Sequence, residues 1–80
     1  MAEYYVDTVE QDNGDHEVHK QGCRFMPKDM YRIYLDEFSN SIDAVCEAKK
    51  FFENSTGCVF CSSEYHALLL DGYNYSELRS

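Results

Sequence analysis

Alternating apolar and polar positions predict three β-strands in the first half of the chain. Residues 3–9 (EYYVDTV) are rich in aromatic and β-branched side chains, which are typical of strands. Asn13 and Gly14 form a turn signal because both residue types tolerate positive φ, so residues 16–20 (HEVHK) are expected to return as the second strand of a hairpin. After a loop that contains Pro27, the segment 30–38 (MYRIYLDEF) alternates again and predicts a third strand.

The pattern changes to helical spacing in residues 39–57. A polar residue at 39–41 is expected to cap the helix, and Gly57 is expected to end the segment. The apolar stripe that should pack on the sheet consists of Ile42, Val45, Ala48 and Phe52. Cys46 lies at the edge of this stripe, where a free thiol behaves as a small hydrophobic side chain.

These elements predict an α+β domain in which a small antiparallel sheet, made of the hairpin and the third strand, packs on one helix. A chain of 80 residues has room for one domain, which we place at residues 1–66. Residues 67–80 are expected to form a C-terminal extension whose final ten residues are partly disordered. HALLL (66–70), which spans this boundary, is expected to be a short strand or helical turn. A domain this small buries only about 60% of its unfolded surface, so a metal ion often supplements the core.

The charge balance narrows the class of partner. The formal net charge is −8, with 15 acidic and 7 scattered basic residues, which argues against nucleic acid and against an anionic membrane surface as partners. The N-terminus is polar and no apolar stretch is long enough to cross a bilayer, so we expect a cytoplasmic location. We also expect a monomer. Thiols are normally reduced in the cytoplasm, and four cysteines there indicate metal binding or redox chemistry.

Two short motifs predict a zinc site with three thiolates and one imidazole. Cys58 and Cys61 form a Cys-x-x-Cys unit that can hold one tetrahedral ion, and Gly57 eases the turn before it. His19 and Cys23 supply a second pair at loop spacing. Zinc in such a site contributes about 10–16 kcal/mol of apparent binding energy, which would dominate the stability of a small domain.

Other interpretations of these residues remain open. His66 follows Cys61 by a few residues and is an alternative fourth ligand in place of His19. His16 falls on the opposite strand face from His19 and is expected to be solvated. A redox function for Cys58 and Cys61 is the main alternative, although such pairs usually open a helix that follows a strand.

Enzymatic function is not expected from this sequence. Glu17 and Glu64 could be proposed as general bases for hydrolysis, but three thiolates tend to close a metal site. No glycine-rich phosphate loop or nucleophile elbow is present. The abundant tyrosines suit a protein-binding surface, so another protein is the expected class of partner for a module of this kind.

The segments HEVHKQGCRFMP, YLDEFSNSIDAVCEAKKFF and GCVFC together resemble a small bacterial zinc-binding module with the pattern His-x-x-x-Cys…Cys-x-x-Cys. Such segments are appended to some bacterial nuclease and competence-type proteins and are distantly similar to the Ada-type metal-binding fold. The resemblance implies that the ligands are His19, Cys23, Cys58 and Cys61. The Ada-type domains use four thiolates and a basic DNA-binding surface, so their methyl transfer is not expected here.

Overall fold

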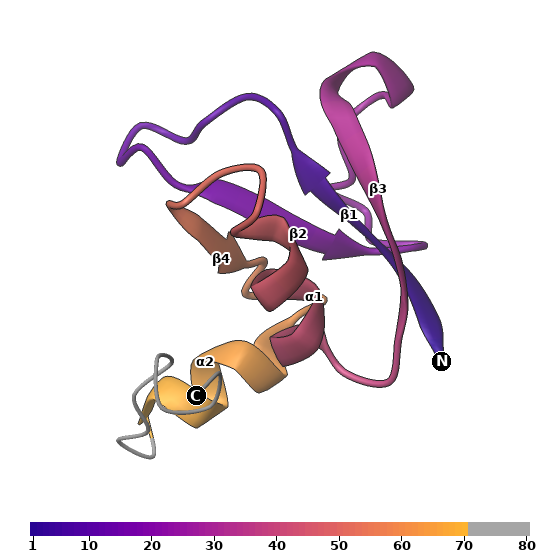
Figure 1. Cartoon of the computed structure of the whole chain (residues 1–80), viewed down its shortest axis with the longest axis vertical. Coiled ribbons are helices and arrows are strands. Elements are labelled where there is room, and N and C mark those ends of the chain that lie inside the picture. The colour runs from indigo at the N-terminus through magenta and orange to yellow at the C-terminus, as the bar shows by residue number, and fades with distance from the viewer. Residues whose placement is uncertain (71–80) are drawn as a thin grey trace.

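A four-stranded mixed sheet and two helices make up residues 1–70, the part of the chain that this computed structural model describes (Figure 1). In chain order the elements are β1 (Ala2–Asp7), β2 (His16–Lys20), the single-turn 3₁₀ helix η1 (Asp29–Tyr31), β3 (Arg32–Phe38), α1 (Ser41–Ala48), β4 (Ser55–Gly57) and α2 (Ser63–Leu70). The strand order is β3-β1-β2-β4, with β1 antiparallel to both β2 and β3, and β4 parallel to β2. The predicted α+β class is confirmed.

The hairpin formed by β1 and β2 follows the predicted turn. Gly14 has φ of +89°, a conformation that glycine adopts without a Cβ penalty. Its N–H donates to the Gln11 carbonyl at 2.8 Å, and the Gln11 N–H donates to the Asp15 carbonyl at 2.8 Å. The turn therefore brings β2 back beside β1 with Val6 opposite Val18.

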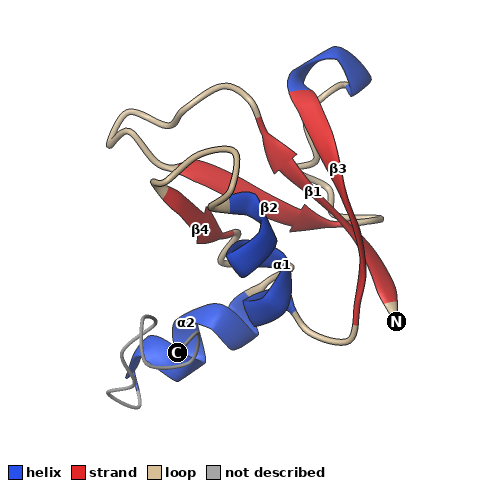
Figure 2. Ribbon diagram, in the orientation of Figure 1, coloured by secondary structure: helices blue, strands red, loops and turns tan. Residues whose placement is uncertain are grey.

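The core lies between the sheet and α1. Its buried apolar side chains come from all three long strands and from both helices, and they are Tyr4, Val6, Val18, Leu35, Ala44, Val45, Ala48 and Tyr65. Ile42 and Phe52 pack against this cluster as partly buried residues, as the predicted stripe requires. Figure 2 shows α1 lying against the sheet beside β2 and β4, with α2 next to α1.

The predicted extent of the first helix is wrong. α1 ends at Ala48 rather than near Gly57, and residues 55–57, which we placed at the end of the helical segment, form β4. Two successive N–H groups, those of Phe51 and Phe52, donate to the Ala48 carbonyl at 2.9 Å and close the helix. The residues of β4 form hydrogen bonds with the backbone groups on the free edge of β2. Long-range strand pairing therefore outweighs the helical pattern there.

Asn40 is the capping residue among the three predicted possibilities. Its side-chain Oδ1 accepts a hydrogen bond from the Asp43 N–H at 3.0 Å, which satisfies one of the free donors at the start of α1.

His16, which we expected to be solvated, is half-buried instead. Its ring stacks on Phe52 with centroids 3.8 Å apart, and its Nδ1 lies 2.9 Å from the Asp7 carbonyl.

The segment HALLL is helical, because it falls within α2. The predicted domain boundary at residue 66 lies inside this helix, and the division into residues 1–66 and 67–80 stays a prediction. The predicted disorder concerns residues 71–80, which lie outside the described part of the chain. Within residues 1–70, neither helix has the length and apolar character needed to cross a membrane.

Candidate metal centre

The parallel pairing of β2 and β4 brings the two predicted ligand pairs together. Val18 on β2 is paired with Gly57 on β4, and the Cys58 N–H continues the ladder by donating to the Val18 carbonyl at 2.9 Å. Because the strands are parallel, the chain leaves both of them at the same end of the sheet. The loop that carries Cys23 therefore meets the turn that carries Cys58 and Cys61.

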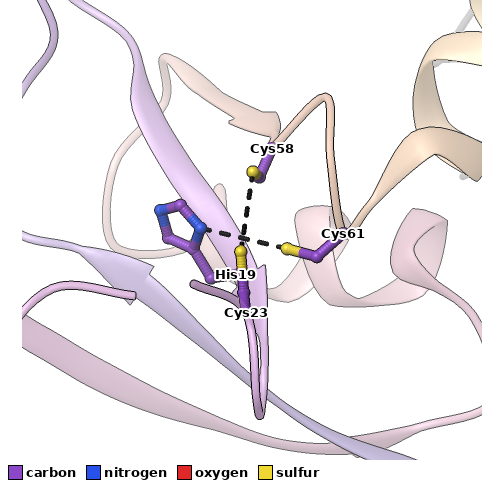
Figure 3. A group of neighbouring side chains, drawn as sticks. All are labelled: His19, Cys23, Cys58 and Cys61. Atoms are coloured by element: carbon purple, nitrogen blue, oxygen red, sulfur yellow. Dashed lines mark hydrogen bonds between the residues drawn. The ribbon is translucent and has the colours of Figure 1, made fainter. Parts of the chain in front are cut away.

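All four predicted ligand residues lie in one cluster. The side chains of His19, Cys23, Cys58 and Cys61 each offer a donor atom, and these atoms lie within 4.8 Å of one another. Figure 3 shows the four side chains pointing toward a common centre, with Nδ1 of His19 turned toward the sulfurs. Cys23 Sγ is 3.9 Å from Cys58 Sγ, and His19 Nδ1 is 3.9 Å from Cys61 Sγ.

Burial differs between the members of the cluster. His19 is 1% exposed and Cys58 is 2% exposed, whereas Cys23 and Cys61 are half-buried. Removing four polarisable donors from water in so small a space is unfavourable unless they share a partner. A divalent cation at the centre would meet that requirement, and three thiolates with one imidazole match a tetrahedral metal site.

Backbone groups hold the two ligand loops against each other. The Lys20 N–H donates to Cys61 Sγ at 3.2 Å, a bond that would stabilise a thiolate. The Cys23 N–H donates to the Lys20 carbonyl at 3.0 Å, and the Ser62 hydroxyl donates to the Val18 carbonyl at 3.1 Å. Both loops are therefore positioned by β2, which itself carries the histidine.

Glu17, which we had considered only as a general base, lies beside the predicted ligand histidine. Its Oε1 lies 3.7 Å from Nε2 of His19, on the side of the ring away from the cysteines. A carboxylate in this position favours the tautomer with the proton on Nε2, which leaves Nδ1 free for a metal. Strand alternation could have indicated this residue, since Glu17 precedes His19 by two positions and shares its face of the strand.

The protonation of the cluster follows from its burial. Burial lowers the pKa of His19 from its usual value, although the nearby carboxylates of Glu17 and Asp7 oppose this effect, so the ring is neutral at pH 7. Burial raises the pKa of the Cys61 thiol to about 12, and the Lys20 N–H partly opposes the rise. A bound cation would reverse the effect at Cys61 by stabilising the thiolate.

The other histidines and the remaining cysteine do not join this cluster. His66, the alternative fourth ligand, donates a ring N–H to the Gly57 carbonyl and is not among the four clustered donors. Cys46 is buried in α1 with an exposed fraction of 6%, consistent with the predicted packing role. All four cysteines are free thiols.

Comparison with protein-family models, with curated proteins and with solved structures finds no significant match to this chain. The resemblance to the bacterial module and to the Ada-type fold therefore stays a prediction. The site rests on the geometry of its own residues.

Proposed function

We propose that His19, Cys23, Cys58 and Cys61 bind one zinc ion whose role is structural, in a small acidic module that binds another protein. The observation that carries this proposal is the convergence of four donor atoms within 4.8 Å of one another, contributed by a strand and by two loops distant in sequence. Three of the four donors are sulfurs, which favour zinc over magnesium or calcium. Iron is the main competitor for the same ligand set.

A structural role is supported by the number of protein ligands. Four side chains fill a tetrahedral zinc site, whereas catalytic zinc sites keep one position open for water or substrate. Glu64, which could have been a general base, accepts a hydrogen bond from the Ser41 N–H at 3.2 Å and so caps α1. The arrangement supports a non-catalytic module.

The redox alternative for Cys58 and Cys61 has weaker support. A reactive dithiol needs an accessible thiolate with a lowered pKa, usually at a helix N-terminus. Cys58 is almost completely buried, and burial raises the pKa of Cys61 to about 12. The motif follows β4 and precedes α2, and its two sulfurs point toward His19 and Cys23 (Figure 3).

Native mass spectrometry of the full chain under reducing conditions tests the metal site. We expect one zinc ion per chain in the wild type, and loss of that ion in Cys58→Ser and in His19→Ala. Cys46→Ala is the matched control, because this thiol lies outside the cluster, and it should retain the zinc.

Two outcomes would contradict the proposal. A folded wild type that takes up no metal when zinc is supplied would refute the proposed zinc site and favour the redox alternative. A dithiol-reduction assay would then test that alternative. Equal metal loss in Cys46→Ala and Cys58→Ser would show that general destabilisation, rather than ligation, determines metal content.

A further inference from the structure

Exposed apolar side chains gather on the two loops that carry the metal ligands. Phe25 follows Cys23 by two positions, and Val59 and Phe60 lie between Cys58 and Cys61. Phe25 is 50% exposed, Val59 57% and Phe60 70%. Single exposed apolar residues are common on protein surfaces, but a cluster on adjacent loops indicates an interaction site.

The two phenylalanines contact each other across the loops. Their rings stack with centroids 4.6 Å apart and an interplanar angle of 29°. The guanidinium of Arg24 lies 5.9 Å from the centre of the Phe25 ring and adds a positive charge beside it. We name the side chains of Arg24, Phe25, Val59 and Phe60 the knuckle patch.

The charge of these loops differs from that of the rest of the molecule. The formal net charge of the chain is −8, yet the charged residues between positions 18 and 28 are all basic, and they are Lys20, Arg24 and Lys28. All three are exposed, and positions 54–63 carry no charged residue. The loops around the knuckle patch therefore form a neutral-to-positive region on an acidic protein.

The ligand cluster would hold the knuckle patch rigid. The Sγ atoms of Cys23 and Cys58 are 3.9 Å apart, so the two loops meet at the cluster. The loop that carries Cys58 and Cys61 is closed by a hydrogen bond from the Ser62 N–H to the Cys58 carbonyl at 2.8 Å. An apolar surface that is fixed before binding loses little entropy when a partner docks. This gives the structural metal a second role, which is to present the aromatic pair.

We propose that the knuckle patch docks an acidic peptide segment of another protein, in which a bulky apolar side chain packs on Phe25 and Phe60 and flanking carboxylates pair with Arg24 and its basic neighbours. This inference rests on the proposed zinc module and specifies its partner. An acidic partner is favoured because its charge complements the basic residues around the knuckle patch. A basic partner would instead be attracted to the rest of the protein surface, which is acidic. Stacking of nucleic-acid bases is disfavoured, because the overall charge repels phosphates and the two rings already stack on each other.

Selection from a display library of short random peptides tests the docking surface. The bait is the full chain loaded with zinc under reducing conditions, with its metal content measured on the same preparation. We expect the enriched peptides to combine a bulky apolar residue with Asp or Glu on either side. The dissociation constant of an enriched peptide, measured by fluorescence anisotropy, should rise about tenfold or more in Phe60→Ser and in Arg24→Glu.

Matched controls separate the patch from general surface effects. Phe51→Ser removes a phenylalanine that is also about half exposed but lies outside the patch, and Lys50→Glu reverses an exposed basic residue elsewhere. Both should bind the peptide as the wild type does. Equal weakening by these controls would overturn the proposal.

The remaining outcomes are also decisive. A zinc-loaded chain that enriches no peptide, or enriches basic ones, refutes the docking inference and leaves the metal site standing. Binding of single-stranded RNA, or self-association of the chain, through Phe60 and Arg24 would assign the patch to another occupant. A chain that binds no zinc would refute both the proposed function and this inference. The metal content of the preparation distinguishes this outcome from failure of the docking inference alone.

Discussion

Gly57 shows how a single residue connects the strand pairing to the ligand cluster. A Cβ at this position would lie 2.9 Å from the Ser62 carbonyl oxygen and 3.2 Å from the Tyr65 Cβ. The nearest of these is a backbone atom that cannot move without displacing the loop that carries Cys58 and Cys61. Glycine is therefore needed here for close approach, whereas at Gly14 and Gly22 it is needed for positive φ.

At this scale we predict that Gly57→Ala destabilises the protein by about 1–3 kcal/mol through overpacking. It should also weaken zinc affinity by about tenfold or more, as changes around metal ligands do. Chemical denaturation and competition with a chromophoric zinc chelator measure the two effects.

Gly14→Ala is the control for general loss of stability. Its φ of +89° makes alanine unfavourable by about 1–2 kcal/mol, but nothing lies within 4 Å of the added Cβ and the turn is outside the cluster. The loss in the free energy of zinc binding should be no larger than the loss in the free energy of unfolding. Equal losses of zinc affinity in the two variants would contradict the steric argument for Gly57.

At the scale of the elements, β3 contains a bulge that the alternating pattern did not reveal. Tyr4 pairs with Asp36 and Tyr5 pairs with Tyr34, so Leu35 is an extra residue in the ladder. Leu35 still reaches the core at 5% exposure, and Asp36 takes the strained φ of +120°. The bulge also makes this edge strand irregular, which hinders pairing with another chain.

We predict that Asp36→Gly stabilises the protein by about 1 kcal/mol. Backbone strain of this kind costs about 1–3 kcal/mol, and glycine relieves it at an entropic cost of about 0.5–1 kcal/mol. Urea denaturation of the zinc-loaded protein measures the change. Glu37→Gly, one residue further along β3, should be destabilising. If both variants lose stability, the hydrogen bond from the Glu37 N–H to Asp36 Oδ1, at 2.7 Å, outweighs the strain.

At the scale of the whole molecule, the described core is too small to make the chain stable with a wide margin. Three of its eight buried apolar residues are the small side chains Ala44, Val45 and Ala48 of α1; β1 contributes two more, and β2, β3 and α2 contribute one each. Small domains of this kind commonly rely on a metal ion. A zinc ion held by the cluster would join β2 to the segment between β4 and α2, so its removal should affect the entire fold.

We predict that chelation under reducing conditions abolishes or strongly lowers the cooperative thermal transition seen by circular dichroism. A fall in pH should act in the same direction, because protons compete with the metal for the three thiolates and the imidazole. Burial lowers the pKa of His19. Protonation of this ring therefore opposes metal binding only at pH values below the usual pKa of histidine. An unchanged transition after proven metal loss would show that the apolar core is sufficient alone.

Local sequence patterns were sufficient for much of the fold. The hairpin, the third strand, the turn at Gly14 and the apolar face of α1 follow from side-chain periodicity and turn chemistry, which act between neighbouring residues. The four clustered residues were likewise predicted, because ligand chemistry and short spacing are visible in the sequence. Their role as ligands awaits the metal measurement.

Tertiary structure decided how those residues meet. Ser55–Gly57 has too few residues to signal a strand, and it becomes β4 because the edge of β2 offers unpaired backbone groups. The same parallel pairing fixes the ligand cluster, and it places Phe25 on Phe60. The sequence by itself thus determined which residues carry the chemistry, through local periodicity and side-chain type. Ligand chemistry indicated that the two motifs meet, but only long-range backbone pairing decided how, because the pairing of β2 with β4 has no signature in either segment alone.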